Sequence, residues 1–204
     1  MQEVILVKLG EIVLKGLNRR TFEDRLLKNI RRRIARAGSF EVYSMQSTIY
    51  IEPKDEDADI DEAEERISKI FGVIGYARAC VCEKDMDAIT KMAPEYLNDT
   101  LAGFKTFKVE SKRADKKFPL GSMEISREVG AALLRTNPHI SVDVHNPEIT
   151  VRVEIREKAA YIHGETKPGA GGIPVGTGGK AAILISGGLD SPVAAWMMAK
   201  RGVG

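Results

Sequence analysis

The sequence contains few cysteines, few aromatic residues and no long apolar stretch. Its two cysteines cannot form a disulfide framework. No apolar run is long enough to cross a membrane, and the first residues lack the basic and apolar regions of a secretory signal. We therefore expect a cytoplasmic protein without a membrane partner. Aromatic residues make up 6% of the chain, so extensive stacking on nucleic-acid bases is not expected.

The remaining composition is that of an ordinary globular protein, but its charges are unevenly distributed. The chain has 204 residues, of which 43% are hydrophobic and 29% are charged, enough for one large or two small domains. The formal net charge of +2 conceals basic clusters at residues 15–36 and 105–117 and an acidic cluster at residues 55–65. Local basic surfaces of this kind favour the binding of a polyanion.

The first 82 residues predict a ferredoxin-like arrangement. Phe22, Leu26, Ile30 and Ile34 recur every four residues, which predicts a helix over about residues 18–37. A second helix is expected over residues 60–71, and strands are expected over residues 3–9, 40–43, 48–51 and 75–82. The resulting order, βαββαβ, is that of a ferredoxin-like fold.

The middle of the chain follows a different order and ends in a segment rich in glycine and proline. Helices are expected over residues 86–101 and 122–135, and strands over residues 104–110, 141–144, 149–155 and 159–163. A basic, irregular segment is expected at residues 112–120. Residues 167–179 contain six glycines and two prolines, which indicates a boundary or linker.

A strand, a glycine-rich turn and a helix are predicted in close succession near residue 190. The apolar residues 183–185 are typical of a buried strand, and residues 192–200 are typical of a helix. We predict Ser191 as the helix N-cap and Pro192 as the first helical residue. The intervening glycines allow close approach of a phosphate, which a helix N-terminus attracts. The same pattern also fits an ordinary strand-to-helix turn.

A Walker A phosphate loop does not fit this region. Gly179 and Lys180 provide the only candidate for its Gly-Lys pair. Pro174 stands where the motif requires its first glycine, and Ala181 stands where it requires a hydroxyl.

The cysteines do not form a recognisable metal site. Cys80 and Cys82 alternate on a predicted strand, and no nearby pair of ligands completes a zinc site. We expect both in or beside the core, and no metal site is predicted.

Four stretches, in chain order, resemble one known family. The stretch Ser186-Gly-Gly-Leu-Asp-Ser191 matches the SGGxDS signature of the PP-loop ATP pyrophosphatases. Residues 9–19 (LGEIVLKGLNR) resemble the N-terminal signature of the bacterial tRNA 4-thiouridine synthetases, which also serve thiazole formation for thiamine. Residues 111–119 (SKRADKKFP) and 171–180 (GGIPVGTGGK) resemble the basic THUMP loop and the segment before the PP-loop of these synthetases. The resemblance covers nearly the whole chain.

The resemblance implies an α+β chain with three parts. A ferredoxin-like N-terminal domain would occupy residues 1–60, with its last helix and strand extending to about residue 82. An α/β THUMP domain that binds RNA would occupy residues 61–166, followed by a linker at residues 167–179. Residues 180–204 would supply the first strand, loop and helix of an α/β PP-loop ATP pyrophosphatase domain. We therefore expect a truncated part of a longer protein.

The resemblance also implies an ATP-dependent tRNA sulfurtransferase. In this family ATP adenylates a carbonyl oxygen of a uridine in tRNA, and persulfide sulfur then displaces AMP to give 4-thiouridine. The family's distal catalytic lysine and cysteine are absent, so we expect the 204-residue chain to be inactive alone. The implied cofactors are ATP and Mg²⁺, and the implied partners are tRNA, a cysteine desulfurase and a thiazole-pathway sulfur-carrier protein. Whether the protein forms a homodimer stays open.

The implied ATP site lies in the glycine-rich turn. Its residues are Leu184, Ile185, Ser186, Gly187, Gly188, Asp190 and Ser191. Asp190 is predicted as the catalytic residue. A bare carboxylate would repel polyphosphate, so we expect Asp190 to orient the loop or help to hold Mg²⁺. Lys180 fits either a phosphate contact or a solvated linker lysine.

Two basic groups are predicted to neutralise tRNA phosphates and position the RNA. They are Lys15, Asn18, Arg19 and Arg20 near the N-terminus, and Lys112, Arg113, Lys116 and Lys117 in the middle. Each group also fits a solvated charged face, as does the run from Arg31 to Arg33. One alternative function is a non-catalytic tRNA-binding THUMP module. Another is a THUMP-bearing RNA methyltransferase, against which the ATP pyrophosphatase loop argues.

Overall fold

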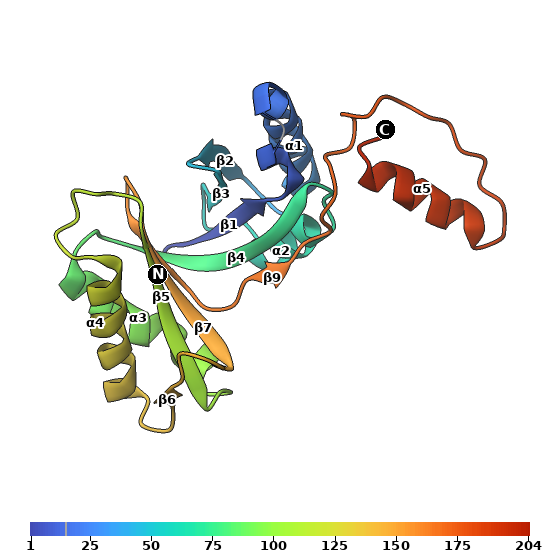
Figure 1. Ribbon diagram of the computed structural model, residues 1–204. Helices are drawn as coiled ribbons and strands as arrows, with labels where there is room; N and C mark the ends of the chain where they lie inside the picture. Colours follow the sequence, from blue (N-terminus) through green and yellow to red (C-terminus); the bar gives the residue numbers. More distant parts are fainter. Residues whose placement is uncertain (15) are drawn as a thin grey trace. The chain divides into compact units, whose positions relative to one another are not determined.

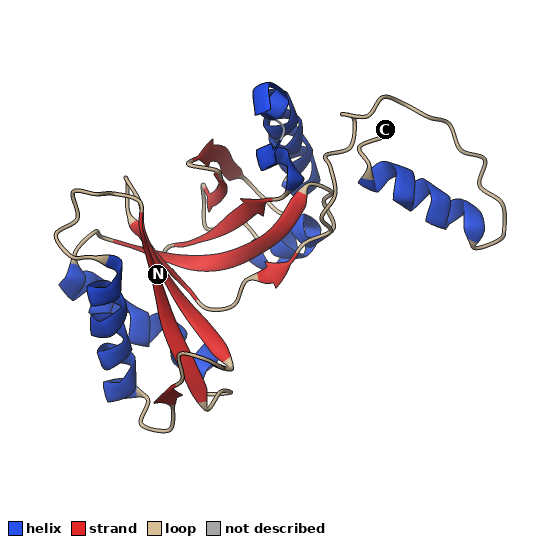
Figure 2. Ribbon diagram, viewed as in Figure 1, coloured by secondary structure: helices blue, strands red, loops and turns tan. Residues whose placement is uncertain are grey.

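The computed structural model describes residues 1–14 and 16–204. The chain divides into two compact units, one comprising residues 1–3 and 77–165 and the other comprising residues 4–76 and 166–204. Helices and strands alternate through both units, as predicted for a mixed α and β protein (Figure 1, Figure 2). No helix in the described part of the chain is both long and apolar enough to span a membrane.

The order βαββαβ predicted for the first 82 residues is confirmed. Its elements are β1 (Glu3–Leu9), α1 (Arg19–Ile34), β2 (Phe40–Met45), β3 (Thr48–Pro53), α2 (Ile60–Ser68) and β4 (Val73–Cys82), with short 3-10 turns at Glu11–Leu14 and Gly16–Asn18. The strands follow the spatial order β2-β3-β1-β4, and β3 is antiparallel to both β2 and β1. Strand β4 begins in this ferredoxin-like unit and continues into the other unit from Ala77.

The core of the ferredoxin-like unit lies between its two helices and one face of its strands. Leu26, Ile30 and Ile34 of α1 are buried, as their four-residue spacing predicted. Ile5 and Val7, on the same face of β1, belong to the same apolar cluster. Burial of each such side chain contributes roughly 1.5–3 kcal/mol. Because this stripe fixes the rotation of α1, the arginines on its other faces are left exposed.

The second unit packs two helices against a mixed sheet. Its elements after β4 are α3 (Met86–Leu101), β5 (Thr106–Arg113), α4 (Ser122–Thr136), β6 (Ser141–Val142), β7 (Ile149–Ile155) and β8 (Ala160–His163). The strand order is β4-β8-β7-β5-β6, with β5 parallel to β6 and β7 and the other pairs antiparallel. Leu97, Val129 and Leu133 of the helices meet Phe107 and Val153 of the sheet in one buried cluster.

The basic segment predicted as irregular at residues 112–120 is partly a strand. Strand β5 continues to Arg113, and its last two residues, Lys112 and Arg113, lie opposite Glu154 and Ile155 of β7. The neighbouring strand supplies hydrogen-bond partners that a pattern of lysines and arginines does not reveal. The irregular loop therefore begins at residue 114.

Residues 167–179, predicted as a linker, are attached to the ferredoxin-like unit. Strand β9 (Lys167–Pro168) pairs with β4. The Gly171 amide donates to the Val73 carbonyl at 2.7 Å. Further along, the Asn29 side-chain amide donates to the Val175 carbonyl at 3.1 Å. The glycines and prolines of this segment therefore mark a bound strap rather than a free connection.

The prediction of a buried strand at residues 183–185 is wrong. Ile183, Leu184 and Ile185 are 44%, 95% and 73% exposed, and no described strand pairs with them. A strand persists where neighbours complete its backbone hydrogen bonds and cover its apolar face. The following helix, α5 (Asp190–Lys200), has no buried residue and provides neither.

Candidate phosphate loop and nucleic-acid surfaces

Two serines close the glycine-rich loop onto the start of α5. The Ser186 amide donates to the Ser191 hydroxyl at 3.0 Å, and the two hydroxyl oxygens lie 3.2 Å apart. The Gly188 amide lies 3.4 Å from the Ser186 hydroxyl, a long hydrogen bond. An added Cβ at Gly187 would meet no atom within 4 Å, so the loop surface is open there. The loop thus brings five of the predicted residues to one helix end, namely Ser186, Gly187, Gly188, Asp190 and Ser191.

The predicted N-cap role of Ser191 is wrong. Helix α5 begins at Asp190, Leu189 occupies the N-cap position, and no side chain of the described residues caps the helix. Pro192 is consequently the third helical residue, and the Ser191 hydroxyl bonds the Ser186 amide instead. The first turn is left without a side-chain acceptor, which is the condition under which a helix N-terminus attracts an anion.

Asp190 lies at this helix end and is exposed. An acid in the first turn interacts favourably with the helix dipole but repels a phosphate at the same place. A bound Mg²⁺ needs only one or two carboxylates when substrate phosphates supply further ligands. Asp190 alone fits that requirement, and the described residues contain no cluster of three or more metal-ligating side chains.

The chain around the loop exposes large apolar side chains. Leu184 and Leu189 are 95% and 85% exposed, and Trp196 and Met197 on α5 are 51% and 58% exposed. Trp196 also meets the ring of Phe71 edge-on, with centroids 5.5 Å apart. Exposed apolar surface of this extent marks a site of further packing or association. The side chains around the candidate phosphate loop therefore do not enclose it.

In the second unit, the predicted RNA-binding residues divide into two kinds. Lys112, Lys116 and Lys117 are exposed, and none forms a salt bridge with another described residue. Arg113 is half-buried, and its guanidinium donates to the Phe118 carbonyl at 3.1 Å. Arg113 therefore shapes the loop, whereas the three lysines remain available to an external anion.

The loop that carries Lys116 and Lys117 is held by buried structure. The amides of Ala114 and Asp115 both donate to the Ile155 carbonyl of β7, at 2.9 and 3.3 Å. The Lys84 ammonium lies 2.8 Å from the Asp115 carboxylate, and this hydrogen bond lowers the pKa of Asp115. Lys84 was not predicted from sequence, because it lies 31 residues from its partner.

A buried polar cluster supports the same region. Glu154, Arg156 and His163 are each less than 6% exposed. The Arg156 Nε atom donates to Glu154 at 2.9 Å, and the His163 ring lies 3.7 Å from the other carboxylate oxygen. Burial opposes ionisation of Glu154, but the neighbouring His163 and Arg156 outweigh it and lower the pKa of Glu154 to about 2. Glu154 and Arg156 flank Ile155, whose carbonyl anchors the loop that carries Lys116 and Lys117, called the lysine loop below.

The second basic group begins α1. Asn18 and Arg20 are exposed, while Arg19 donates to the Ser47 hydroxyl at 2.9 Å and lies 3.5 Å from Glu23. Lys15, predicted with them, lies outside the described residues. The first turn of α1 contains no acidic residue. Cations at a helix N-terminus oppose the dipole, and of these two arginines Arg19 alone has an acidic partner one helical turn along among the described residues, so helix stability does not account for Arg20.

The two cysteines lie where the sequence predicted. Cys80 is buried and Cys82 is half-buried. Burial raises the pKa of Cys82 to about 12, which keeps its thiol protonated at neutral pH. Neither cysteine has the environment of a reactive thiolate.

Three domain families match the chain in order. Residues 4–77 match the ThiI ferredoxin-like domain, residues 83–163 match the THUMP domain, and residues 176–204 match the family described as thiamine biosynthesis protein (ThiI). A probable tRNA sulfurtransferase of Acetivibrio thermocellus is 47% identical over 205 residues, which cover 100% of this chain and 52% of that protein.

Two solved structures resemble the whole chain. The crystal structure of a 4-thiouridine synthetase–RNA complex with bound ATP has a TM-score of 0.87 at 37% identity and covers 100% of this chain and 51% of its own. PH1313 from Pyrococcus horikoshii has a TM-score of 0.86 at 31% identity, with 98% of this chain and 66% of its own covered. The present chain spans about half the length of the curated relatives that it matches. With the three domains in the same order and near 47% identity throughout, this chain belongs to the ThiI family.

Proposed function

We propose that this chain is the N-terminal half of an ATP-dependent tRNA sulfurtransferase that makes 4-thiouridine. The observation that carries the proposal is the uncapped start of α5 behind the Ser186–Ser191 loop, in a chain that also presents exposed lysines on a THUMP unit. One half of this arrangement suits a nucleotide phosphate, and the other suits RNA. The similarity to a synthetase crystallised with both RNA and ATP supports the pairing.

The proposed reaction solves a leaving-group problem. A uridine carbonyl oxygen leaves poorly, whereas AMP leaves well. Attack of that oxygen on the α-phosphate of ATP would attach AMP and release pyrophosphate. Sulfur delivered as a persulfide by a cysteine desulfurase would then add to the carbon and displace AMP together with the former carbonyl oxygen. A cysteine thiol would have to cleave the remaining S–S bond, so that the two cysteine sulfurs leave as a disulfide and the transferred sulfur stays on the uridine.

The residues of the loop have distinct proposed roles. The amides of Ser186, Gly187, Gly188 and Ser191 would hold the phosphates, with the two serine hydroxyls assisting. The backbone at Leu184 and Ile185 would line the nucleotide. Asp190 would orient the loop or help to hold Mg²⁺, which would neutralise charge on the phosphates when bound.

The proposed RNA surface is the lysine loop of the THUMP unit, with Asn18, Arg19 and Arg20 as a second group. Lys112, Lys116 and Lys117 would neutralise backbone phosphates and position the tRNA without reading its sequence. Because tRNA modification takes place where tRNA resides, we propose a cytoplasmic location. Sulfur transfer to a thiazole-pathway carrier protein, and pairing with a second copy of the protein, belong to the same proposal.

The exposure of the glycine-rich loop is relevant to whether the 204-residue chain can thiolate tRNA without the rest of the protein. All ten residues from Ala181 to Asp190 are exposed, so water competes freely for the loop amides. We therefore propose that the 204-residue chain by itself does not thiolate tRNA. The same exposure favours the second candidate function, a non-catalytic tRNA-binding module.

A substitution at Asp190 tests the enzymatic proposal. In the full-length protein that contains this chain, Asp190→Ala is expected to lower 4-thiouridine formation and ATP–pyrophosphate exchange about 100-fold. Asp87→Ala is the matched control, because Asp87 is also an exposed acid in the first turn of a helix, α3. The control is expected to retain activity within about twofold, as surface substitutions usually do. Full turnover by the Asp190 variant, or no exchange by the wild type, would contradict the proposal.

A further inference from the structure

A basic pocket lies between the end of α1 and α2 in the ferredoxin-like unit. Its volume is about 480 Å³, and its lining includes Val175 of the strap. The charged residues of the pocket are Arg32, Arg33, Arg36, Arg66 and Lys69, and none of the described residues that line it is acidic. A hollow lined by charge of one sign concentrates the electric field and attracts counter-ions.

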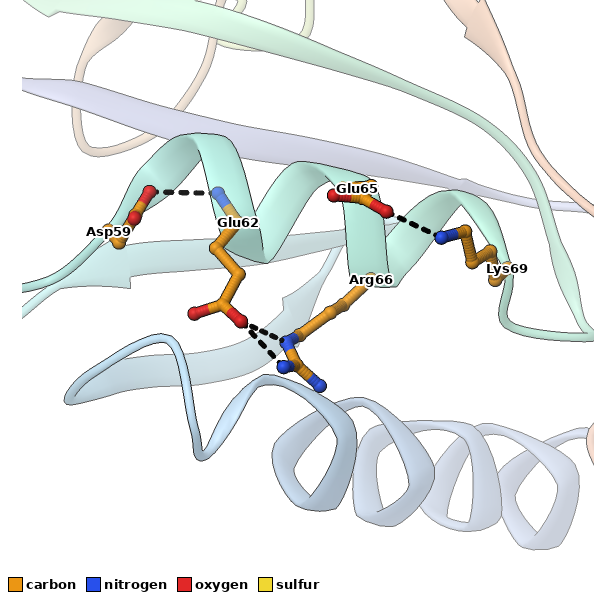
Figure 3. A network of polar contacts seen from close by, with 5 residues as sticks. All are labelled: Asp59, Glu62, Glu65, Arg66 and Lys69. Atoms are coloured by element: carbon orange, nitrogen blue, oxygen red, sulfur yellow. Dashed lines mark hydrogen bonds and ion pairs between the residues drawn. The ribbon is translucent and has the colours of Figure 1, made fainter.

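The two cations from α2 are already partly neutralised. Figure 3 shows Glu62 against Arg66 and Glu65 against Lys69, with Asp59 at the start of the helix. The Arg66–Glu62 contact is 2.5 Å and the Lys69–Glu65 contact is 2.6 Å. Each pair joins residues one helical turn apart, the spacing that stabilises a helix. Local helix stability therefore accounts for the cations of α2.

The three arginines at the end of α1 and just beyond it are different. Arg32, Arg33 and Arg36 are exposed, and no salt bridge joins any of them to a described residue. A cation near a helix C-terminus is favourable, but α1 also carries arginines at its N-terminus, where the dipole opposes them. The dipole therefore favours Arg32 and Arg33 where they stand, but it does not account for a pocket in which five cations meet with no acidic residue in the described lining. An external anion would neutralise the cations that have no partner in the described part of the chain.

We infer that this pocket binds phosphate groups of an RNA backbone, as a further RNA-contact surface besides the lysine loop and the basic group at the start of α1. Guanidinium groups match phosphate oxygens with two parallel hydrogen bonds, and four of the five cations are arginines. Val175 of the strap lines the pocket, and the Asn29 side-chain amide donates to its carbonyl at 3.1 Å, so RNA in the pocket would contact the strap that leads to the glycine-rich loop. The inference rests on the proposed function, because it takes RNA as the substrate.

The test compares two variants of equal charge. Arg33→Gln with Arg36→Gln removes two pocket cations, and Lys28→Gln with Lys54→Gln removes two exposed cations that do not line the pocket. Binding of tRNA to the 204-residue chain is measured by filter binding over a salt series. The pocket variant is expected to lose about tenfold in affinity, and its salt slope is expected to fall by about 1.4–1.8, because each of the two lost phosphate contacts removes about 0.7–0.9 from the slope. The control slope is expected to stay within about 0.3 of wild type.

Further measurements separate the outcomes. A third variant, Arg33→Lys with Arg36→Lys, keeps the charge and is expected to keep the slope, while circular dichroism confirms that all variants are folded. Equal slopes for the pocket and control variants, with tRNA still bound by the wild type, would overturn the pocket alone. If the pocket variant lost binding to inorganic phosphate or ATP while its tRNA salt slope matched that of the wild type, the assignment of the pocket to RNA would be overturned. Absence of tRNA binding by the wild type would overturn the proposed function as well.

Discussion

The loop that presents Lys116 and Lys117 and the glycine-rich loop before α5 are both predicted to meet phosphates, but they are built differently. The lysine loop is anchored to β7 through the Ile155 carbonyl and to Lys84 through Asp115. The glycine-rich loop is closed by its own two serines and is exposed along its length. The lysine loop is therefore attached to a packed core, whereas the glycine-rich loop is not packed against one.

This difference reflects what each kind of site requires. Contacts to an RNA backbone function at an exposed surface, because their affinity comes from many phosphates and the release of counter-ions. Phosphoryl chemistry requires donors that are fixed in a site from which water is excluded. The exposure of the lysines therefore suits the RNA contacts that we propose, whereas the exposed glycine-rich loop lacks the dry surroundings that phosphoryl chemistry requires.

The largest effect is expected from breaking the buried ion pair that supports the lysine loop. Glu154→Gln removes the carboxylate that pairs with buried Arg156 and is expected to lower the free energy of unfolding by about 3–5 kcal/mol. Urea denaturation measures the change. Exposed Glu157→Gln is the control and is expected to cost less than about 0.5 kcal/mol. Similar losses in both variants would show that the cluster does not support the unit.

The pH dependence of the unfolding free energy tests the role of Glu154 further. The pKa of Glu154 is lowered from 4.5 to about 2 in the folded chain. Its ionisation therefore stabilises the fold fully above about pH 5, and this contribution is lost as the pH falls towards 2. The loss is expected to be on the order of 3 kcal/mol. The measurement is the difference in unfolding free energy between wild type and Glu154→Gln at each pH, and a constant difference would contradict the assignment.

The smallest effect is expected in the glycine-rich loop. Ser191→Ala removes the acceptor of the Ser186 amide and is expected to lower the unfolding free energy by less than about 0.5 kcal/mol, because water replaces an exposed hydrogen bond. The comparison is Ser126→Ala, whose hydroxyl donates to Ser111 at 2.8 Å in a half-buried setting and is expected to contribute about 1 kcal/mol. Thermal unfolding distinguishes them. A larger loss at Ser191 would mean that the loop is already an integral part of its unit.

The elements with clear periodicity could be predicted from the sequence. The expected helix at residues 86–101 matches α3, and the four-residue spacing of Leu26, Ile30 and Ile34 placed α1 correctly. The apolar run at residues 183–185 was misleading, because a short apolar segment becomes a strand only when other strands pair with it. The N-cap prediction at Ser191 failed for a related reason, since its hydroxyl found a nearer partner in the loop.

The sequence by itself determined the order of the elements, the ferredoxin-like pattern, and the motifs that carry the family resemblance, because these depend on local spacing along the chain. Only the tertiary structure decided that Arg113 turns towards a carbonyl while Lys116 and Lys117 point to solvent. It also decided that Arg33 and Arg66, which are distant in sequence, line one pocket. Such choices depend on which groups the folded chain brings within a few ångströms, and local spacing does not contain that information.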